Sequence, residues 1–306
     1  MEALSKASAP AVLGCAEWTR RRDAHEARVD RLVAAHLARR RAAQRHPVED
    51  FLFTYYSFRP AALRRWHPGP GVLLRGQTPL ARHQGYRVYE DGVGLDPAHV
   101  AGRRAAVRWT RDLLEATADR APSFGCLGLH EWAMVYRTPP DRVRHPAWPL
   151  RLGSTGTDEV VESHRIACTH FDAFRFFTPE ARPRNTERPT REEQAQQEQP
   201  GCLHAGMDLY KWAYKLAPMT PSELLADCFE LARDIRVLDM RASPYDLTAL
   251  GYPPVRIETV TGKREYADGQ RAFARRAAPL RQRLVQVCTD LLEMSAQVDE
   301  DHTRRC

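Results

Sequence analysis

The sequence predicts a mainly α-helical protein with small β-hairpin insertions, built as a single compact domain with a long N-terminal helix. Apolar residues recur at helical spacing over most of the 306-residue chain. Short β-like pieces bounded by turn residues are confined to two places. No internal repeat and no second composition regime divides the chain, which is long enough to bury a substantial core.

The long helix is predicted over residues 17–45. No Gly or Pro interrupts this segment before Pro47, and Trp18, Val29 and Val33 belong to its narrow apolar stripe. Its opposite face is rich in arginine, which is typical of a solvated helix laced with acidic partners and also of an arm that follows phosphates by charge.

The two β-like regions are residues 71–96 and 255–266, the second with an expected turn at Thr261-Gly262. Further helices are predicted over residues 99–119, 220–240 and 267–294, from their apolar spacing. The helix near residue 220 has a clear start signal, because Thr220-Pro221-Ser222-Glu223 combines capping residues, an early proline and an acid in the first turn.

The predicted domain covers residues 16–294. We expect a flexible leader over 1–15, an exposed loop over 177–199, which is polar and rich in Pro, Arg, Glu and Gln, and a disordered tail over 295–306.

Composition and charge limit the class of protein. No run of about 18 apolar residues exists, so no membrane span is expected. The seven scattered cysteines favour a cytoplasmic, reducing location over a disulfide scaffold. The net charge of +7 suggests an anionic partner such as nucleic acid. However, only four of the cationic residues are lysine, and abundant arginine with little lysine is also typical of proteins encoded by GC-rich genomes, whatever they bind. No obligate protein partner is inferred.

Carboxylates recur beside aromatic residues in three segments. These acids are Glu131, Asp172 and Asp208, and the neighbouring rings are Tyr136, Phe174, Tyr210 and Trp212. An apolar wall raises a carboxyl pKa, and aromatic faces stack planar rings and attract cations. The pattern is typical of a pocket for a flipped, positively charged purine, and also of an ordinary aromatic core, which is the more common origin of such spacings.

Two Cys-x-His pairs offer metal ligands: Cys168 with His170, and Cys202 with His204. In an extended segment residues i and i+2 share a face, so the four side chains could bind a tetrahedral zinc ion. The spacing is not that of a zinc knuckle, and free Cys is common in cores. No metal or other cofactor is therefore favoured, and zinc stays a minority hypothesis. Position 134 is Met, so His130-Glu131 does not begin an H-E-x-x-H motif.

Five segments together resemble a bacterial family, abundant in actinobacteria, whose members are labelled 3-methyladenine DNA glycosylase. They are FLFTYYSFRPAALRRWHPG, GLHEWAMVYR, CTHFDAFRFFTP, QPGCLHAGMDLYKWAYKL and CFELARDIRVLDMRASPYDL. The resemblance covers roughly residues 16–285. It is not to the helix-hairpin-helix glycosylases, because the Gly-rich hairpin signature is missing.

The resemblance implies an enzyme that hydrolyses the N-glycosidic bond of alkylated purines in double-stranded DNA, and hence a cytoplasmic, nucleoid-associated protein. The base would be flipped into an aromatic pocket, and one carboxylate would stabilise the sugar cation. Expected catalytic residues are Asp172, Asp208 and Glu131. Expected base-stacking residues are Tyr136, Phe174, Tyr210 and Trp212. Expected water-orienting residues are His130, His170 and His204. Expected contacts to the DNA backbone are Arg64, Arg65, Arg175, Lys211 and Lys215.

One position departs from the family pattern. Gly206 stands where the resemblance implies Asn. If that Asn side chain holds a ligand or a neighbouring carboxylate, we expect this chain to differ in activity or substrate. Two other functions remain open from the sequence. The first is a zinc-dependent hydrolase or lyase acting on a nucleoside, nucleotide or modified RNA base. The second is a non-catalytic nucleic-acid-binding protein, supported by the arginine-rich first helix.

Overall fold

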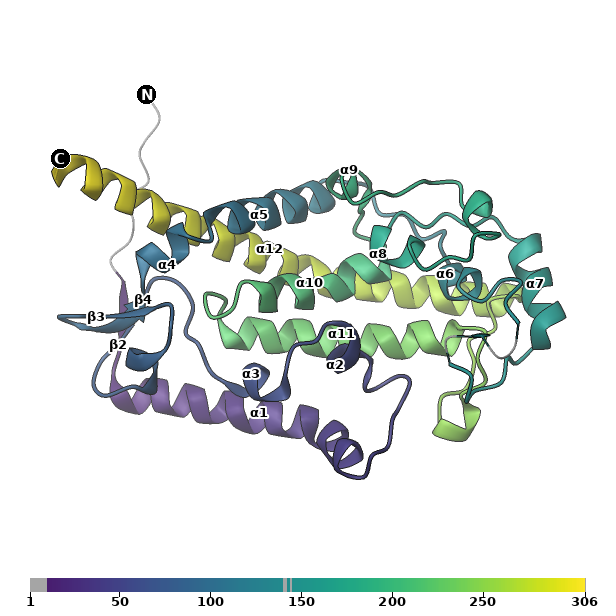
Figure 1. Cartoon of the computed structure of the whole chain (residues 1–306), viewed down its shortest axis with the longest axis horizontal. Helices are drawn as coiled ribbons and strands as arrows, with labels where there is room; N and C mark the ends of the chain where they lie inside the picture. The colour runs from purple at the N-terminus through teal and green to yellow at the C-terminus, as the bar shows by residue number, and fades with distance from the viewer. Residues whose placement is uncertain (1–9, 140–141, 144, 306) are drawn as a thin grey trace.

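The structure is a computed structural model that describes residues 10–139, 142–143 and 145–305. It is mainly helical with one small sheet, as the sequence predicts. The long helices run along the length of the molecule, and the sheet lies at one end (Figure 1).

The centre of the fold is a group of long helices. Helix α10 (Leu203–Lys215) packs against α11 (Ser222–Ala242) and α12 (Val260–Arg305). Helix α5 (Arg104–Ala118) packs on α12, and α1 (Cys15–Arg41) contacts α11 along the lower side of the view in Figure 1. The predicted long N-terminal helix is thus confirmed.

The sheet has the order β1-β2-β4-β3. Its strands are β1 (Ala11–Leu13), β2 (Val72–Leu74), β3 (Tyr86–Tyr89) and β4 (Gly92–Leu95). Strand β1 runs parallel to β2, whereas β4 pairs antiparallel with both β2 and β3. The β-hairpin predicted within 71–96 is present. Residues 11–13 of the expected leader form β1, which corrects that prediction, and residues 1–9 lie outside the described part of the chain.

Shorter helices fill the remaining chain. They are α2 (Phe51–Tyr55), α3 (Pro60–Arg64), η1 (Pro79–Arg82), α4 (Pro97–Ala101), α6 (Leu129–Ala133), α7 (Gly153–Ser163), α8 (Phe171–Phe174), η3 (Arg182–Arg184), α9 (Gln194–Gln197) and η4 (Thr248–Leu250). Helix α7 lies at the end of the molecule opposite the sheet, with α6 beside it, and α8 lies nearer the middle (Figure 1).

Three further sequence predictions are corrected by the structure. The region 255–266 forms no hairpin, because α12 begins at Val260. The segment 177–199 is not simply exposed, since Phe177, Asn185 and Glu198 are buried. The expected tail is helical, because α12 continues to Arg305.

Helix α10 is buried on nearly every side, which is the position of a central helix. Most of its residues are apolar, but His204, Asp208 and Lys211 are spaced i, i+4 and i+7, so they lie along one face. The central helix therefore presents a polar stripe to the interior, and buried charges require partners. Those partners define the candidate site.

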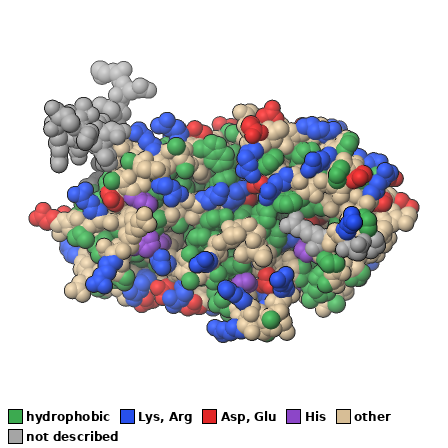
Figure 2. Space-filling model, viewed as in Figure 1, with side chains coloured by type: hydrophobic (Ala, Val, Ile, Leu, Met, Phe, Trp, Pro, Cys, Tyr) green, Lys and Arg blue, Asp and Glu red, His purple; other side chains and the backbone are tan. Residues whose placement is uncertain are grey.

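The surface in view carries Lys and Arg side chains spread among acidic and apolar ones (Figure 2). On this face the positive charge is not gathered into one block, so the net charge alone identifies no nucleic-acid surface here. Among the described residues, no helix combines the length and the apolar character needed to cross a membrane.

Candidate functional site

In the polar stripe of α10, the ammonium group of Lys211 lies between the carboxylates of Asp172 and Asp208. Lys211 Nζ donates to Asp172 Oδ2 at 2.6 Å and to Asp208 Oδ2 at 2.7 Å. Tyr56 donates its hydroxyl to Asp208 Oδ1 at 3.0 Å. Asp172, on α8, is 36 residues from Asp208 in the sequence, so the fold brings together two of the predicted catalytic acids.

Electrostatics keeps both acids ionised. Burial raises the pKa of Asp208, but Lys211 and His170 outweigh it, so that the net shift is downward. Asp172 follows the same pattern, with burial opposed mainly by Lys211. The pKa of Lys211 is lowered by burial and raised more strongly by the two carboxylates. The three groups thus form a charged cluster inside the protein.

His170 adds an imidazole to this cluster, at the N-terminal end of α8. Its Nε2 lies 3.2 Å from Glu198 Oε1 and 3.4 Å from Asp208 Oδ2. Burial lowers the pKa of His170, but the two carboxylates raise it to about 9. An imidazolium at this position fits the surrounding charge.

A second buried cluster joins α6 to α11. Arg236 and Asp239 share a face of α11 at i, i+3, and the consecutive residues His130 and Glu131 of α6 meet them. Arg236 Nη1 donates to Glu131 Oε1 at 2.7 Å and lies 3.4 Å from Asp239 Oδ2. His130 Nε2 lies 3.0 Å from Asp239 Oδ1.

His204 connects the two clusters. Its ring centroid is 4.5 Å from that of His130 and 5.3 Å from that of His170. Burial, followed by the charge of His130, lowers the pKa of His204 well below its usual value. A neutral imidazole therefore stands between two charged clusters, with a lone pair available for a ligand.

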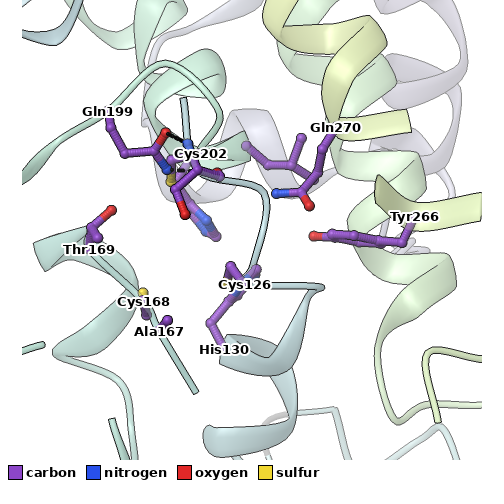
Figure 3. Close-up of a pocket in the computed structure, with 12 residues that line it drawn as sticks. Cys126, His130, Ala167, Cys168, Thr169, Gln199, Cys202, Tyr266 and Gln270 are labelled. Carbon is purple, nitrogen blue, oxygen red and sulfur yellow. Dashed lines mark hydrogen bonds between the residues drawn. The ribbon is translucent and has the colours of Figure 1, made fainter. Parts of the chain in front are cut away.

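Two small cavities meet at His204, each of about 10 Å³, enough for one water molecule or ion. The first, which we call the aromatic cavity, is lined by the rings of Phe51, Tyr55 and Phe176 and by Glu131, Asp172 and His204. The second, the cysteine cavity, is lined by Cys126, Cys168, Cys202, His130 and His204, and Figure 3 shows the three cysteines around it.

The rings predicted to stack a base lie elsewhere. Tyr210 is fully buried and packs on Tyr56 and Phe229 as core. Tyr136 bonds Glu162, and Trp212 packs on Trp109. Phe174 packs on Phe177. The aromatic cavity is lined by Phe51, Tyr55 and Phe176 instead. A cavity with aromatic rings beside a carboxylate is therefore present, but its rings are not the predicted ones.

The predicted DNA-contacting residues fall into separate groups. Arg64 pairs with Glu26 and Asp30, and it shares a groove of about 520 Å³ with Arg65, away from both cavities. Arg175 pairs with Asp172 at 3.1 Å, beside the aromatic cavity. Lys215 is exposed and lies over the Trp212 ring. Lys211 is buried, so its partners are the two acids.

The predicted zinc ligands do not form one set. Cys202 precedes α10 and His204 lies within it, so the two are not related as in a strand. Cys168 and Cys202 line the cysteine cavity, whereas His170 turns to Glu198 and Asp208. Among the described residues, two other groups bring ligand atoms within 4.8 Å of one another: His130 with His204 and Asp239, and His170 with Glu198 and Asp208.

Sequence reasoning missed Glu198, Arg236 and Asp239. Glu198 lies in the segment expected to be an exposed loop, and its burial depends on tertiary packing. Arg236 and Asp239 had a detectable signal, because two charged residues at i, i+3 beside the apolar Ile235 and Leu238 imply a charged pair on the buried side of a helix.

Gly206 faces α11 rather than the polar stripe. A Cβ at this position would lie 3.0 Å from Ile235 Cδ1. We therefore expect Gly206→Asn to lower the free energy of unfolding by about 1–3 kcal/mol through overpacking. Urea denaturation of the variant measures this. Ile235→Val in the same chain should recover part of the loss, and an unchanged stability of Gly206→Asn would contradict the close contact.

No protein-family model matches the chain, and no curated protein or solved structure is significantly similar to it. The resemblance to the 3-methyladenine DNA glycosylase family therefore stays a prediction from the sequence.

Proposed function

We propose that the chain is an enzyme that hydrolyses the N-glycosidic bond of alkylated purines in DNA. The observation that carries this proposal is the aromatic cavity, in which Phe51, Tyr55 and Phe176 face Asp172 and Glu131. Aromatic rings beside an ionised carboxylate suit a cationic base whose departure leaves positive charge on the sugar. The resemblance implies the same substrate.

Asp172 is the carboxylate best suited to stabilise the sugar cation. It lines the aromatic cavity, and its pKa is held down by Lys211 against the effect of burial. Glu131 is already paired with Arg236. Asp208 is 1% exposed and bonds Lys211 and Tyr56, so its role in this proposal is to position the ammonium.

Two partly exposed arginines beside Asp172 suit contact with DNA phosphates. Arg175 and Arg191 both pair with Asp172, and their side chains are 42% and 54% exposed. A phosphate approaching this side would attract both guanidinium groups away from the carboxylate. Their movement would free Asp172 to face the sugar.

A base requires more room than the present cavity provides. About 10 Å³ holds a single water molecule. Binding therefore requires the rings of Tyr55 and Phe176, whose centroids are 6.3 Å apart, to separate. Helix α2, which carries Tyr55, has only five residues, so it is a suitable element to move.

The test is release of free base from DNA methylated with a simple alkylating agent, measured by chromatography. We expect release by the wild-type protein and a loss of at least about 100-fold in Asp172→Asn. Glu162→Gln is the matched control, because Glu162 binds Tyr136 and lies outside the aromatic cavity.

Release at the wild-type rate by Asp172→Asn would reject the assignment of this residue. No release by the wild type would reject the glycosylase. If methylated DNA were then bound with a steep salt dependence, the result would favour the non-catalytic nucleic-acid-binding protein.

A further inference from the structure

The side chains of His130, His204 and Asp239 form a cluster that offers three potential metal-ligand atoms. One nitrogen from each histidine and one carboxylate oxygen lie within 4.8 Å of one another. Asp239 is fully buried and His130 is 2% exposed. The three residues come from α6, α10 and α11, so the fold and not a local motif brings them together.

The contact between His130 and Asp239 is close but is not a hydrogen bond. Nε2 lies 3.0 Å from Oδ1, yet this buried nitrogen has no hydrogen-bond partner. At this separation a hydrogen bond fails only when the N–H direction misses the oxygen. The two groups are therefore in contact without a directed hydrogen bond between Nε2 and the carboxylate.

The same arrangement suits two ligands of one metal ion. Atoms about 2.1 Å from a shared ion, at coordination angles between octahedral and tetrahedral, are about 3.0–3.4 Å apart. The 3.0 Å between Nε2 and Oδ1 falls at the lower end of this range. The other nitrogen of His130 lies 3.3 Å from Cys126 Sγ, a contact that holds the ring with Nε2 toward Asp239.

The ligand types indicate which class of ion would bind. Two imidazoles and one carboxylate favour divalent zinc or ferrous iron over magnesium or calcium, which prefer oxygen ligands. His204 lines both cavities, so a fourth coordination position would open into a space that holds one water molecule. Three protein ligands with one open position are typical of a catalytic metal site rather than a structural one.

The neighbouring cluster of His170, Glu198 and Asp208 is a poorer site. Its carboxylate oxygens already accept from close proton donors: Asp208 from Tyr56 and Lys211, and Glu198 from Gln194. Asp239 accepts only over longer distances, from the Tyr266 hydroxyl at 3.5 Å and from Arg236 at 3.4 Å. The Lys211 ammonium, 2.7 Å from Asp208, would repel a cation there more strongly than the Arg236 guanidinium, 3.4 Å from Asp239, would in the first cluster. This cluster therefore serves as the matched control for the first.

We propose that His130, His204 and Asp239 bind one zinc or ferrous ion at the wall shared by the two cavities. This site differs from the Cys-x-His set considered from the sequence, with which it shares only His204. It does not rest on the glycosylase proposal, because binding of the ion can be measured without any substrate.

The first measurement is metal content and affinity. Purified full-length protein, stripped with a chelator, is titrated with Zn²⁺, anaerobic Fe²⁺ and Mg²⁺ in separate calorimetric experiments. We expect one Zn²⁺ or Fe²⁺ per chain, a higher melting temperature on binding, and no comparable effect of Mg²⁺. Absence of binding and of any thermal shift with both Zn²⁺ and Fe²⁺ would overturn the proposal.

Variants then locate the ion. His204→Gln and Asp239→Asn should each weaken binding by at least about 100-fold, since each removes one of three protein ligands, while His170→Gln should bind like the wild type. Asp239→Asn removes a buried partner of Arg236, so His204→Gln is the decisive variant if the former does not fold. Wild-type affinity in folded His204→Gln would place the ion elsewhere and reject the site.

X-ray absorption of the metal-loaded protein separates this site from a cysteine site. We expect only nitrogen and oxygen ligands, at about 2.0–2.2 Å. A sulfur shell at about 2.3 Å, lost in Cys202→Ser, would reject the proposed ligands in favour of the cysteine cavity. If the metal binds as proposed but no base is released from methylated DNA, the glycosylase proposal fails while this one stands.

Discussion

Replacing Lys211 with methionine should lower the free energy of unfolding at pH 7 by about 3–5 kcal/mol. The methionine keeps most of the apolar volume but removes the ammonium that binds both Asp172 and Asp208. Asp208 is 1% exposed, so its buried carboxylate would lose its closest cation and keep only His170, at 3.4 Å. An uncompensated buried charge is among the most destabilising single changes.

Urea denaturation measures the effect, and Lys215→Met is the matched control. Lys215 lies one turn further along α10 and is exposed, so its loss should change the free energy of unfolding by no more than about 0.5 kcal/mol. Replacing Asp172 and Asp208 by Asn in the Lys211→Met chain should recover part of the loss. Equal stabilities of Lys211→Met and Lys215→Met would show that the ammonium is not what holds the two acids.

The pH dependence has a definite sign. In the wild type the folded pKa of both Asp172 and Asp208 is depressed, so their contribution to stability is present above the unfolded pKa of about 3.9 and is lost as pH falls through the lower folded values. Without Lys211 that depression becomes smaller, since Lys211 is the largest charge that lowers both pKa values. The difference between wild type and Lys211→Met should therefore be largest near pH 7 and should shrink below about pH 4.

The long helices could be predicted from the sequence because their apolar stripes are local signals. The stripe of α11, including Leu224, Leu231 and Ile235, repeats at helical spacing and is buried as predicted. The hairpin of β3 and β4 could be predicted for the same reason, because turn residues lie between two short β-like segments. In both cases neighbours in sequence decide the structure.

The region 255–266 shows where a local signal was ambiguous. Thr261-Gly262 suggested a hairpin turn, but Thr259 Oγ1 accepts from the Gly262 backbone N–H at 3.1 Å and thereby caps the start of α12. A side chain at Gly262 would collide with the backbone of Arg256. The glycine therefore permits a close approach of two chain segments, which no turn propensity reveals.

The candidate site could be predicted only in part. His130, Glu131, Asp172, His204 and Asp208 were singled out for their residue types, and the fold does gather them in the interior. Their partners could not be found by the same route, because each partner comes from another element across the core. The two Cys-x-His pairs are not gathered as one set for a related reason: the sequence reasoning assumed an extended backbone at Cys202 and His204, where α10 begins.

Arg236 carries the second large expected effect, and Arg236→Met should also lower the free energy of unfolding by about 3–5 kcal/mol. The guanidinium is 3% exposed and donates to Glu131 at 2.7 Å. It also lies 3.4 Å from Asp239 and 3.9 Å from the centroid of the Phe51 ring. Its loss leaves the buried carboxylate of Glu131 without its cation, takes one partner from Asp239, which keeps His130, and removes a cation–π contact.

The matched control is Arg233→Met on the same helix. Arg233 pairs with Asp234 at 3.7 Å near the surface, and exposed pairs contribute about 0–1 kcal/mol. Arg236→Lys distinguishes the effect of the charge from that of the planar guanidinium. The lysine keeps a positive charge beside the two carboxylates but loses the planar contact with Phe51, so the stability of this variant should fall between those of the wild type and Arg236→Met. A lysine variant as unstable as the methionine variant would show that stacking and fork geometry, and not charge, hold α6 against α11.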